Sequence, residues 1–168
     1  MDCFQVDWKG FYSLDDAQNK PESREKGIYG VYKQNKVLYY IGESQEVGKR
    51  LSEHREAWAR ILSKSEMQSL SVCFGTIFSY EGSRPNLNIT LKQLKDIESF
   101  FINTYKPEGN SEASKKGYKG IPLFVVNTGK INKLDKIICH NPDFIKLLKG
   151  CLLPKQAHKP KLSSALDW

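Results

Sequence analysis

The sequence predicts a small α+β domain in which an antiparallel sheet of about three main strands is flanked by helices. Two β-rich runs, 28–33 and 37–42, flank a short segment centred on Asn35, which is typical of a hairpin with a tight turn. Apolar residues then recur at helical spacing over about 47–64. Residues 70–80 are rich in strand-forming side chains and predict the third strand.

The flanking segments follow from the same patterns. Apolar side chains alternate within residues 1–12, which predicts a short edge strand or a packed arm. The polar segments 13–26 and 81–87 are predicted to be loops. A second amphipathic helix should begin after Asn88 or Thr90, since either could cap it, and it should run to about residue 104.

The last third of the chain is less regular. Segment 106–120 contains three Gly, one Pro and four Lys and is predicted to be a surface loop. A strand is expected over 121–127, and 130–139 fits either another strand or a short helix. Residues 143–153 fit a short amphipathic helix, and the final fifteen residues are expected to be loosely ordered.

The net charge of +7 is distributed unevenly. Residues 1–104 carry equal numbers of basic and acidic side chains, so the whole excess lies in 105–168. Such asymmetry favours a surface that faces a polyanion, and Lys115, Lys116 and Lys119 are the candidate nucleic-acid-binding residues. The alternative is a solvated tail that promotes solubility.

Membrane and secreted classes are disfavoured. The chain has no run of about 18 apolar residues, and its N-terminus has an early acid and no apolar core of a signal peptide. The four cysteines are scattered and form no C-x-x-C pair, which favours free thiols over disulfides or zinc. A cytoplasmic protein that does not enter a membrane is therefore expected.

Two tripeptides carry the clearest functional signal. Gly27-Ile28-Tyr29 and Tyr40-Ile41-Gly42 are separated by ten residues, so the hairpin can lay two phenols side by side. Arg50 and His54 follow four residues apart and share one face of the predicted helix. Taken singly, each of these residues fits ordinary packing or a solvated helix face; their order and spacing together indicate a site.

This constellation resembles the GIY-YIG nuclease family, in which the two tripeptides are followed by positions matched here by Ser44, Arg50 and His54. Two further family positions match Glu98 and Asn110, and the resemblance covers about residues 26–112. It implies a GIY-YIG-like catalytic domain with an N-terminal arm over 1–112, followed by a basic C-terminal extension over 113–168. The implied function is metal-dependent endonucleolytic hydrolysis of DNA.

The resemblance also implies a role for each catalytic residue. Tyr29 would take a proton from the attacking water, Tyr40 would position water or phosphate, and His54 would hydrogen-bond the tyrosines or relay a proton. A phenol needs nearby cationic charge to act as a base at neutral pH, and Arg50 or the metal would provide it.

The remaining roles concern phosphate and metal. Arg50 would contact phosphate oxygens in a fork geometry, and Glu98 would bind one Mg²⁺ or Mn²⁺. Asn110 would hold the site together or contact the scissile strand. Two alternatives stay open: a catalytically weak nucleic-acid-binding module with the same fold, and a nuclease that acts on RNA. Sequence specificity and oligomeric state are not indicated.

Overall fold

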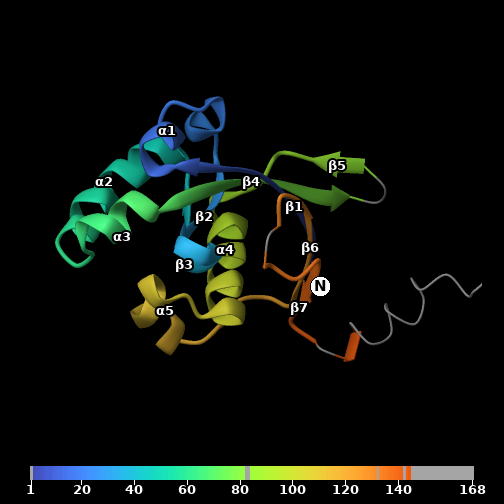
Figure 1. The fold of residues 1–168 in the computed structure, drawn as a ribbon. Helices are drawn as coiled ribbons and strands as arrows, with labels where there is room; N and C mark the ends of the chain where they lie inside the picture. The colour runs from blue at the N-terminus through green and yellow to red at the C-terminus, as the bar shows by residue number, and fades with distance from the viewer. Residues whose placement is uncertain (1, 82–83, 132, 142, 145–168) are drawn as a thin grey trace, which may run out of the picture.

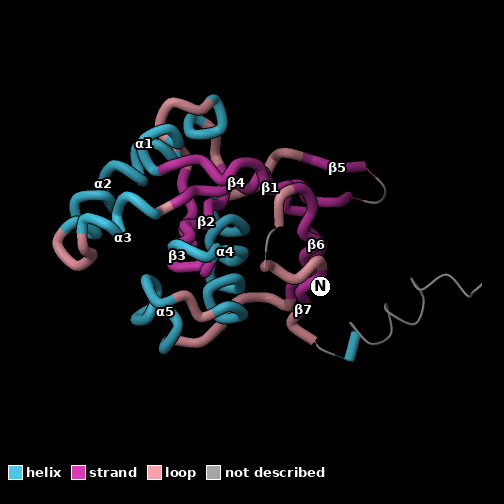
Figure 2. Tube along the Cα trace, viewed as in Figure 1, coloured by secondary structure: helices cyan, strands magenta, loops and turns pink. Residues whose placement is uncertain are grey.

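The computed structural model describes residues 2–81, 84–131, 133–141 and 143–144. These residues form an α+β fold in which helices pack against one mixed sheet (Figures 1 and 2). The strands are β1 Asp2–Ser13, β2 Gly27–Lys33, β3 Val37–Ser44, β4 Ser71–Glu81, β5 Arg84–Asn86, β6 Leu123–Gly129 and β7 Ile137–Cys139. The α-helices are α1 Leu14–Ala17, α2 Val47–Ala59, α3 Lys64–Ser69, α4 Leu91–Tyr105 and α5 Ser111–Lys115. Short 3-10 helices are η1 Pro21–Arg24, η2 Gln34–Lys36 and η3 Glu108–Asn110.

The sheet is larger than the three main strands predicted from the sequence. Its described part has seven strands in the order β3-β2-β4-β1-β6-β7, and β5 pairs with β4. The pairings are antiparallel except for β1 with β6, which is parallel. The α+β class is therefore confirmed, and the strand number was wrong because β1, β5, β6 and β7 also pair into the sheet.

The N-terminal strand is the main correction. β1 lies in the interior of the sheet, between β4 and β6, rather than at an edge. Its alternating Phe4, Val6 and Trp8 are at most 2% exposed and face the core. The strand continues through an irregularity near Phe11, whose φ of 97° accompanies a shift in the register with β4.

The predicted hairpin is confirmed. β2 and β3 pair antiparallel and are joined by η2, whose last residue Lys36 takes a left-handed conformation with φ 59°. The helix predicted over about 47–64 ends earlier, at Ala59, and a capping box between Ser63 and Glu66 starts a separate helix, α3, at Lys64. α4 begins as predicted, with Thr90 and Gln93 forming its capping box.

The segments predicted as loops contain short elements. α1 and η1 lie within 13–26, β5 lies within 81–87, and η3 and α5 lie within 106–120. β6 begins two residues later than the predicted strand and ends at Gly129, whose φ is 72°. Of the two alternatives left open for 130–139, a strand occurs only at the end of the range, as β7. The helix predicted over 143–153 lies almost entirely outside the described residues, and the last fifteen residues lie wholly outside them.

Two apolar clusters pack on opposite sides of the sheet. One joins β1, β2 and β6 to the buried face of α4, whose Leu94, Ile97 and Phe101 are fully buried. The other joins β2 and β4 to α1 and α2 through Leu51 and Trp58. α2 and α4 therefore both contact the β2–β3 hairpin. None of the helices among the described residues has the length and hydropathy needed to span a bilayer.

Candidate active site

The paired tyrosines lie on the hairpin as expected. The Tyr29 and Tyr40 ring centroids are 6.0 Å apart, with an angle of 31° between the rings. Tyr29 pairs with Gly42 in the β2–β3 ladder, while Tyr40 lies diagonally across from it. A side chain on Gly42 would clash, since a Cβ there would lie 2.5 Å from the Tyr29 hydroxyl. The glycine that closes the second tripeptide therefore makes room for the first tyrosine.

The Tyr29 hydroxyl is buried and unpaired. Tyr29 is 0% exposed, and its Oη finds no hydrogen-bond partner within the described part of the chain. Burial, followed by the neighbouring Tyr40 hydroxyl, raises the pKa of Tyr29 well above its usual value, although the Arg50 guanidinium acts in the opposite direction. Tyr29 is therefore a neutral phenol in the free protein.

Tyr40 connects the hairpin to α2. Its Oη lies 3.1 Å from Nε2 of His54, and the His54 ring stacks on Trp58 at 5.2 Å with an interplanar angle of 12°. Burial and then the Arg50 charge lower the pKa of His54, so its imidazole is neutral at pH 7. Burial and the Glu98 charge raise the pKa of Tyr40 to about 12. A neutral imidazole and a protonated phenol thus share this hydrogen bond.

Helical spacing brings Arg50 to the same place. Arg50, His54 and Trp58 are four residues apart on α2 and share one face of the helix. The Arg50 side chain is 47% exposed and its Nη1 donates to Glu53 at 2.8 Å. An exposed ion pair of this kind contributes at most about 1 kcal/mol, so a stronger anionic ligand can compete for the guanidinium.

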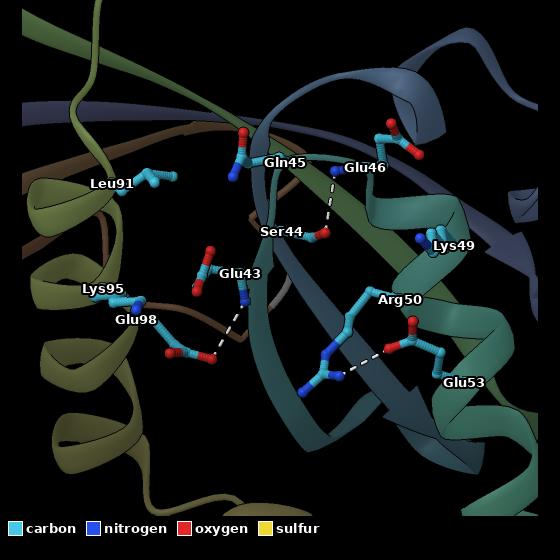
Figure 3. A pocket seen from close by; sticks show the side chains of 10 residues that line it. All are labelled: Glu43, Ser44, Gln45, Glu46, Lys49, Arg50, Glu53, Leu91, Lys95 and Glu98. Atoms are coloured by element: carbon cyan, nitrogen blue, oxygen red, sulfur yellow. Dashed lines mark hydrogen bonds and ion pairs between the residues drawn. The ribbon is translucent and has the colours of Figure 1, made fainter.

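Glu98 approaches from α4, on the other side of the hairpin (Figure 3). Its Oε1 accepts a hydrogen bond of 3.2 Å from the Glu43 backbone N–H. Burial and then the Glu43 carboxylate raise the pKa of Glu98 from 4.5 to about 7. Its ionised form is thus destabilised in the free protein, and a bound cation would favour it.

An open cleft of about 620 Å³ lies between α2 and α4, with the end of β3 between them (Figure 3). The residues that line it are Glu43, Ser44, Gln45, Glu46, Lys49, Arg50, Glu53, Leu91, Lys95 and Glu98. Lys49 and Lys95 were not identified from the sequence. Helical spacing was the available signal for Lys95, because it lies one turn before Glu98, whereas the position of Lys49 directly before Arg50 gives no such signal.

Asn110 lies beneath the site. It is 7% exposed, and its side-chain amide makes two hydrogen bonds with the backbone of Ile41, at 2.7 Å to the N–H and 2.8 Å to the C=O. β3 is an edge strand, so Asn110 satisfies backbone groups that no neighbouring strand reaches. Of the two roles expected for it, this geometry corresponds to holding the Tyr40-bearing strand in place.

The three candidate lysines lie elsewhere. Lys115 ends α5 and pairs with Glu112 at 2.7 Å. Lys116 and Lys119 border a separate hollow on the side of α4 that carries Asp96. None of the three lines the cleft that contains Glu98 and Arg50.

The cleft suits a hard divalent cation. Glu98 has a carboxylate oxygen without a hydrogen-bond partner among the described residues, and the Glu43 carboxylate faces the same space (Figure 3). Within the described ranges, no three or more His, Cys, Asp and Glu side chains are placed so that they could hold one metal ion together. Mg²⁺ keeps several waters and uses few protein carboxylates, so a site with Glu98 as its main protein ligand is chemically suitable.

Comparison with known proteins gives one match. The family model described as the GIY-YIG catalytic domain matches residues 25–113, which include the hairpin, α2, α4 and Asn110. No curated protein and no solved structure matches the chain. The matched residues contain every side chain described above at the cleft and leave α1 and η1 outside.

Proposed function

The chain belongs to the GIY-YIG nuclease family, and from this premise we propose that it is a Mg²⁺- or Mn²⁺-dependent endonuclease that hydrolyses phosphodiester bonds of DNA. The observation that carries the proposal is the convergence of the tyrosine pair, Arg50, His54 and Glu98 around one open cleft. Phosphodiester hydrolysis needs a proton acceptor for water and positive charge near the phosphate, and this arrangement provides candidates for both.

Glu98 would hold the cation, whose charge would offset the negative charge that develops on the phosphate. Arg50 would leave Glu53 and contact the non-bridging oxygens as the phosphate enters the cleft. Both groups act on Tyr29: its pKa is lowered by Arg50 and raised by Glu98. A cation held by Glu98 would offset the carboxylate charge and so lower the pKa of Tyr29, which would increase the fraction of Tyr29 that is ionised and able to accept a proton.

Three other side chains would orient Tyr40. His54 Nε2 would accept a hydrogen bond from the Tyr40 hydroxyl, so that the Tyr40 oxygen lone pairs remain available to water or phosphate. Trp58 would fix the plane of the imidazole through its stacked ring. Asn110 would keep Tyr40 in place through the backbone of its neighbour Ile41.

The function is tested with supercoiled plasmid DNA and a matched RNA substrate. Cleavage of the plasmid with Mg²⁺ or Mn²⁺, and none with EDTA, is the expected result. Cleavage of RNA alone would favour the RNA nuclease, and binding without cleavage would favour the weak binding module. Sequencing of the product ends would also give the position of the cut.

Replacing Arg50 by lysine should impair cleavage although the charge is kept. A lysine cannot reproduce the fork contact with two phosphate oxygens, and removal of one such donor lowers kcat by about 10²- to 10³-fold. Arg55→Lys is the matched control, because Arg55 lies on the same helix and pairs with Asp15 away from the cleft. Single-turnover rates check this, and near wild-type cleavage by Arg50→Lys would exclude the fork contact.

The triple replacement of Lys115, Lys116 and Lys119 by glutamine should weaken DNA binding. The slope of log affinity against log salt should become shallower by up to about 0.9 for each phosphate that the protein no longer neutralises. Salt titrations and the saturating single-turnover rate are measured together. An unchanged slope with a lower rate would mean that this segment aligns Asn110 instead.

A further inference from the structure

We propose that a second groove, next to the active-site cleft, binds the DNA backbone on one side of the cleavage position. The groove has a volume of about 540 Å³ and lies between η1 and the first turn of α2. The residues that line it include Gln18, Asn19, Ser23, Arg24, Glu46 and Lys49. The inference rests on the proposed function, because it gives the strand that is cut a path beyond the cleft.

The groove is continuous with the active-site cleft. Glu46 and Lys49 line both, so the two spaces meet at the first turn of α2. Figure 3 shows both side chains at the end of the cleft that is farther from Glu98. A strand whose phosphate lies beside Arg50 can therefore continue into the groove without leaving the protein surface.

The walls of the groove are fixed to each other. Ser23 of η1 is 3% exposed, and its hydroxyl donates to the backbone carbonyls of Gln18 at 2.9 Å and Lys20 at 2.6 Å. Gly48 of α2 packs on it so closely that a Cβ there would lie 3.0 Å from the Ser23 Cβ. The groove is thus a built feature of the fold rather than a space between two independent segments.

The side chains in the groove suit a phosphodiester backbone. Arg24 and Lys49 are exposed and form no ion pair with any described residue. The amide side chains of Gln18 and Asn19 likewise have no hydrogen-bond partner in the described ranges. Cationic groups neutralise phosphates, and side-chain amides also donate to phosphate oxygens and sugars. Glu46 is the single acid among the residues that line the groove, at its junction with the cleft.

One wall of the groove lies outside the residues that the family model matches. Gln18, Asn19 and Arg24 all precede the residues matched by the family model, which begin at 25. This wall of the groove therefore extends beyond the matched catalytic domain, and its position beside the cleft predicts that the DNA it binds lies on one side of the cut.

The test measures the affinity of the Arg24→Gln/Lys49→Gln variant for DNA without divalent cations. A set of duplexes shares one cleavage position and is lengthened on one side or the other. The wild-type protein should bind more tightly when one side is lengthened, and the variant should not. At low salt the variant should bind at least about tenfold more weakly, with a salt slope shallower by up to about 0.9 per phosphate.

Two further variants separate a specific interaction from net charge. Arg60→Gln/Lys64→Gln removes the same charge from exposed positions at the far end of α2 and the start of α3, and its affinity should stay within about twofold of wild type because solvent and salt screen distant charges. Glu46→Gln should tighten binding, because it removes the acid beside the path. If Arg24, Lys49 and Glu46 only supported the fold, replacing the two cations and replacing the acid would not change DNA affinity in opposite directions.

The groove assignment is overturned if the two double variants lose affinity equally, or if the dependence on length persists in Arg24→Gln/Lys49→Gln. If either of these results is found while the wild-type protein still cuts DNA, the proposed function stands and only the groove is rejected. A length-dependent affinity without any cleavage would support the groove and reject the endonuclease. A length dependence seen with RNA and not with DNA would reject both DNA assignments.

Discussion

Replacing Glu98 by glutamine should abolish cleavage, with an expected decrease of at least about 10³-fold in kcat, because several kcal/mol of transition-state charge stabilisation depends on the bound cation. Glutamine keeps an oxygen that can accept the hydrogen bond from the Glu43 backbone N–H, so local geometry should persist. It lacks the negative charge that a hard cation needs. Single-turnover plasmid cleavage at saturating Mg²⁺ measures the effect, and a near wild-type rate would exclude Glu98 as the metal ligand.

Stability measurements show whether the Glu98→Gln variant is folded. The pKa of Glu98 is raised from 4.5 to about 7, so the folded state binds its proton more tightly than the unfolded state does. Ionisation of Glu98 between these values therefore lowers the free energy of unfolding as the pH rises. Above pH 7 without metal, the variant should have a Tm equal to or higher than that of the wild type.

Added Mg²⁺ or Mn²⁺ gives an independent check of the same residue. A ligand that binds only the folded state raises its stability, so the wild-type Tm should rise with metal concentration. The Glu98→Gln variant should show no such rise. A normal metal-dependent rise in an inactive variant would mean that Glu98 acts in catalysis without holding the cation.

The sequence predicted the parts of the fold whose signals are local. The β2–β3 hairpin, the start of α4 and its capping box at Thr90 all depend on residues that are close together in the chain. The position of β1 does not, because its parallel partner β6 begins at Leu123, more than a hundred residues away. Alternation alone indicates a strand with a buried face and cannot distinguish an edge strand from a central one.

The candidate site shows the same division. The four-residue spacing of Arg50 and His54 predicted a shared helix face, and the tyrosine pair followed from the hairpin. The location of Lys115, Lys116 and Lys119 could not be predicted from the sequence, because an uneven charge along the chain does not indicate where those charges lie in space. Lys116 and Lys119 border a hollow on the Asp96 side of α4, whereas Glu98 faces the cleft.

The burial of Tyr29 also had no signal in the sequence. Its hydroxyl depends on a close approach between β2 and β3 at Gly42 and on the packing of α2 over the hairpin. An unpaired buried hydroxyl destabilises a folded protein by about 1–3 kcal/mol, and such groups gather where function requires them. Tyr29 should therefore be a residue whose hydroxyl favours activity at the expense of stability.

Replacing Tyr29 by phenylalanine should reduce cleavage by about 10²- to 10⁴-fold, the range typical of removing a general base. The ring should still pack against Tyr40, since only the hydroxyl is removed. The free energy of unfolding should stay unchanged or rise, by at most about 1–3 kcal/mol, because this hydroxyl has no hydrogen-bond partner among the described residues. Single-turnover rates and denaturant unfolding measure the two effects on the same preparation.

Tyr32 provides the matched control for this substitution. It lies on the same strand and is also 0% exposed, and its hydroxyl likewise has no partner in the part of the chain that the structure describes. Tyr32 belongs to the apolar cluster on the other side of the sheet, where it packs against Phe11. Tyr32→Phe should therefore show the same change in stability while cleavage continues at the wild-type rate. Equal decreases of activity in both variants would mean that the buried hydroxyls act through the fold, and the base role of Tyr29 would be rejected.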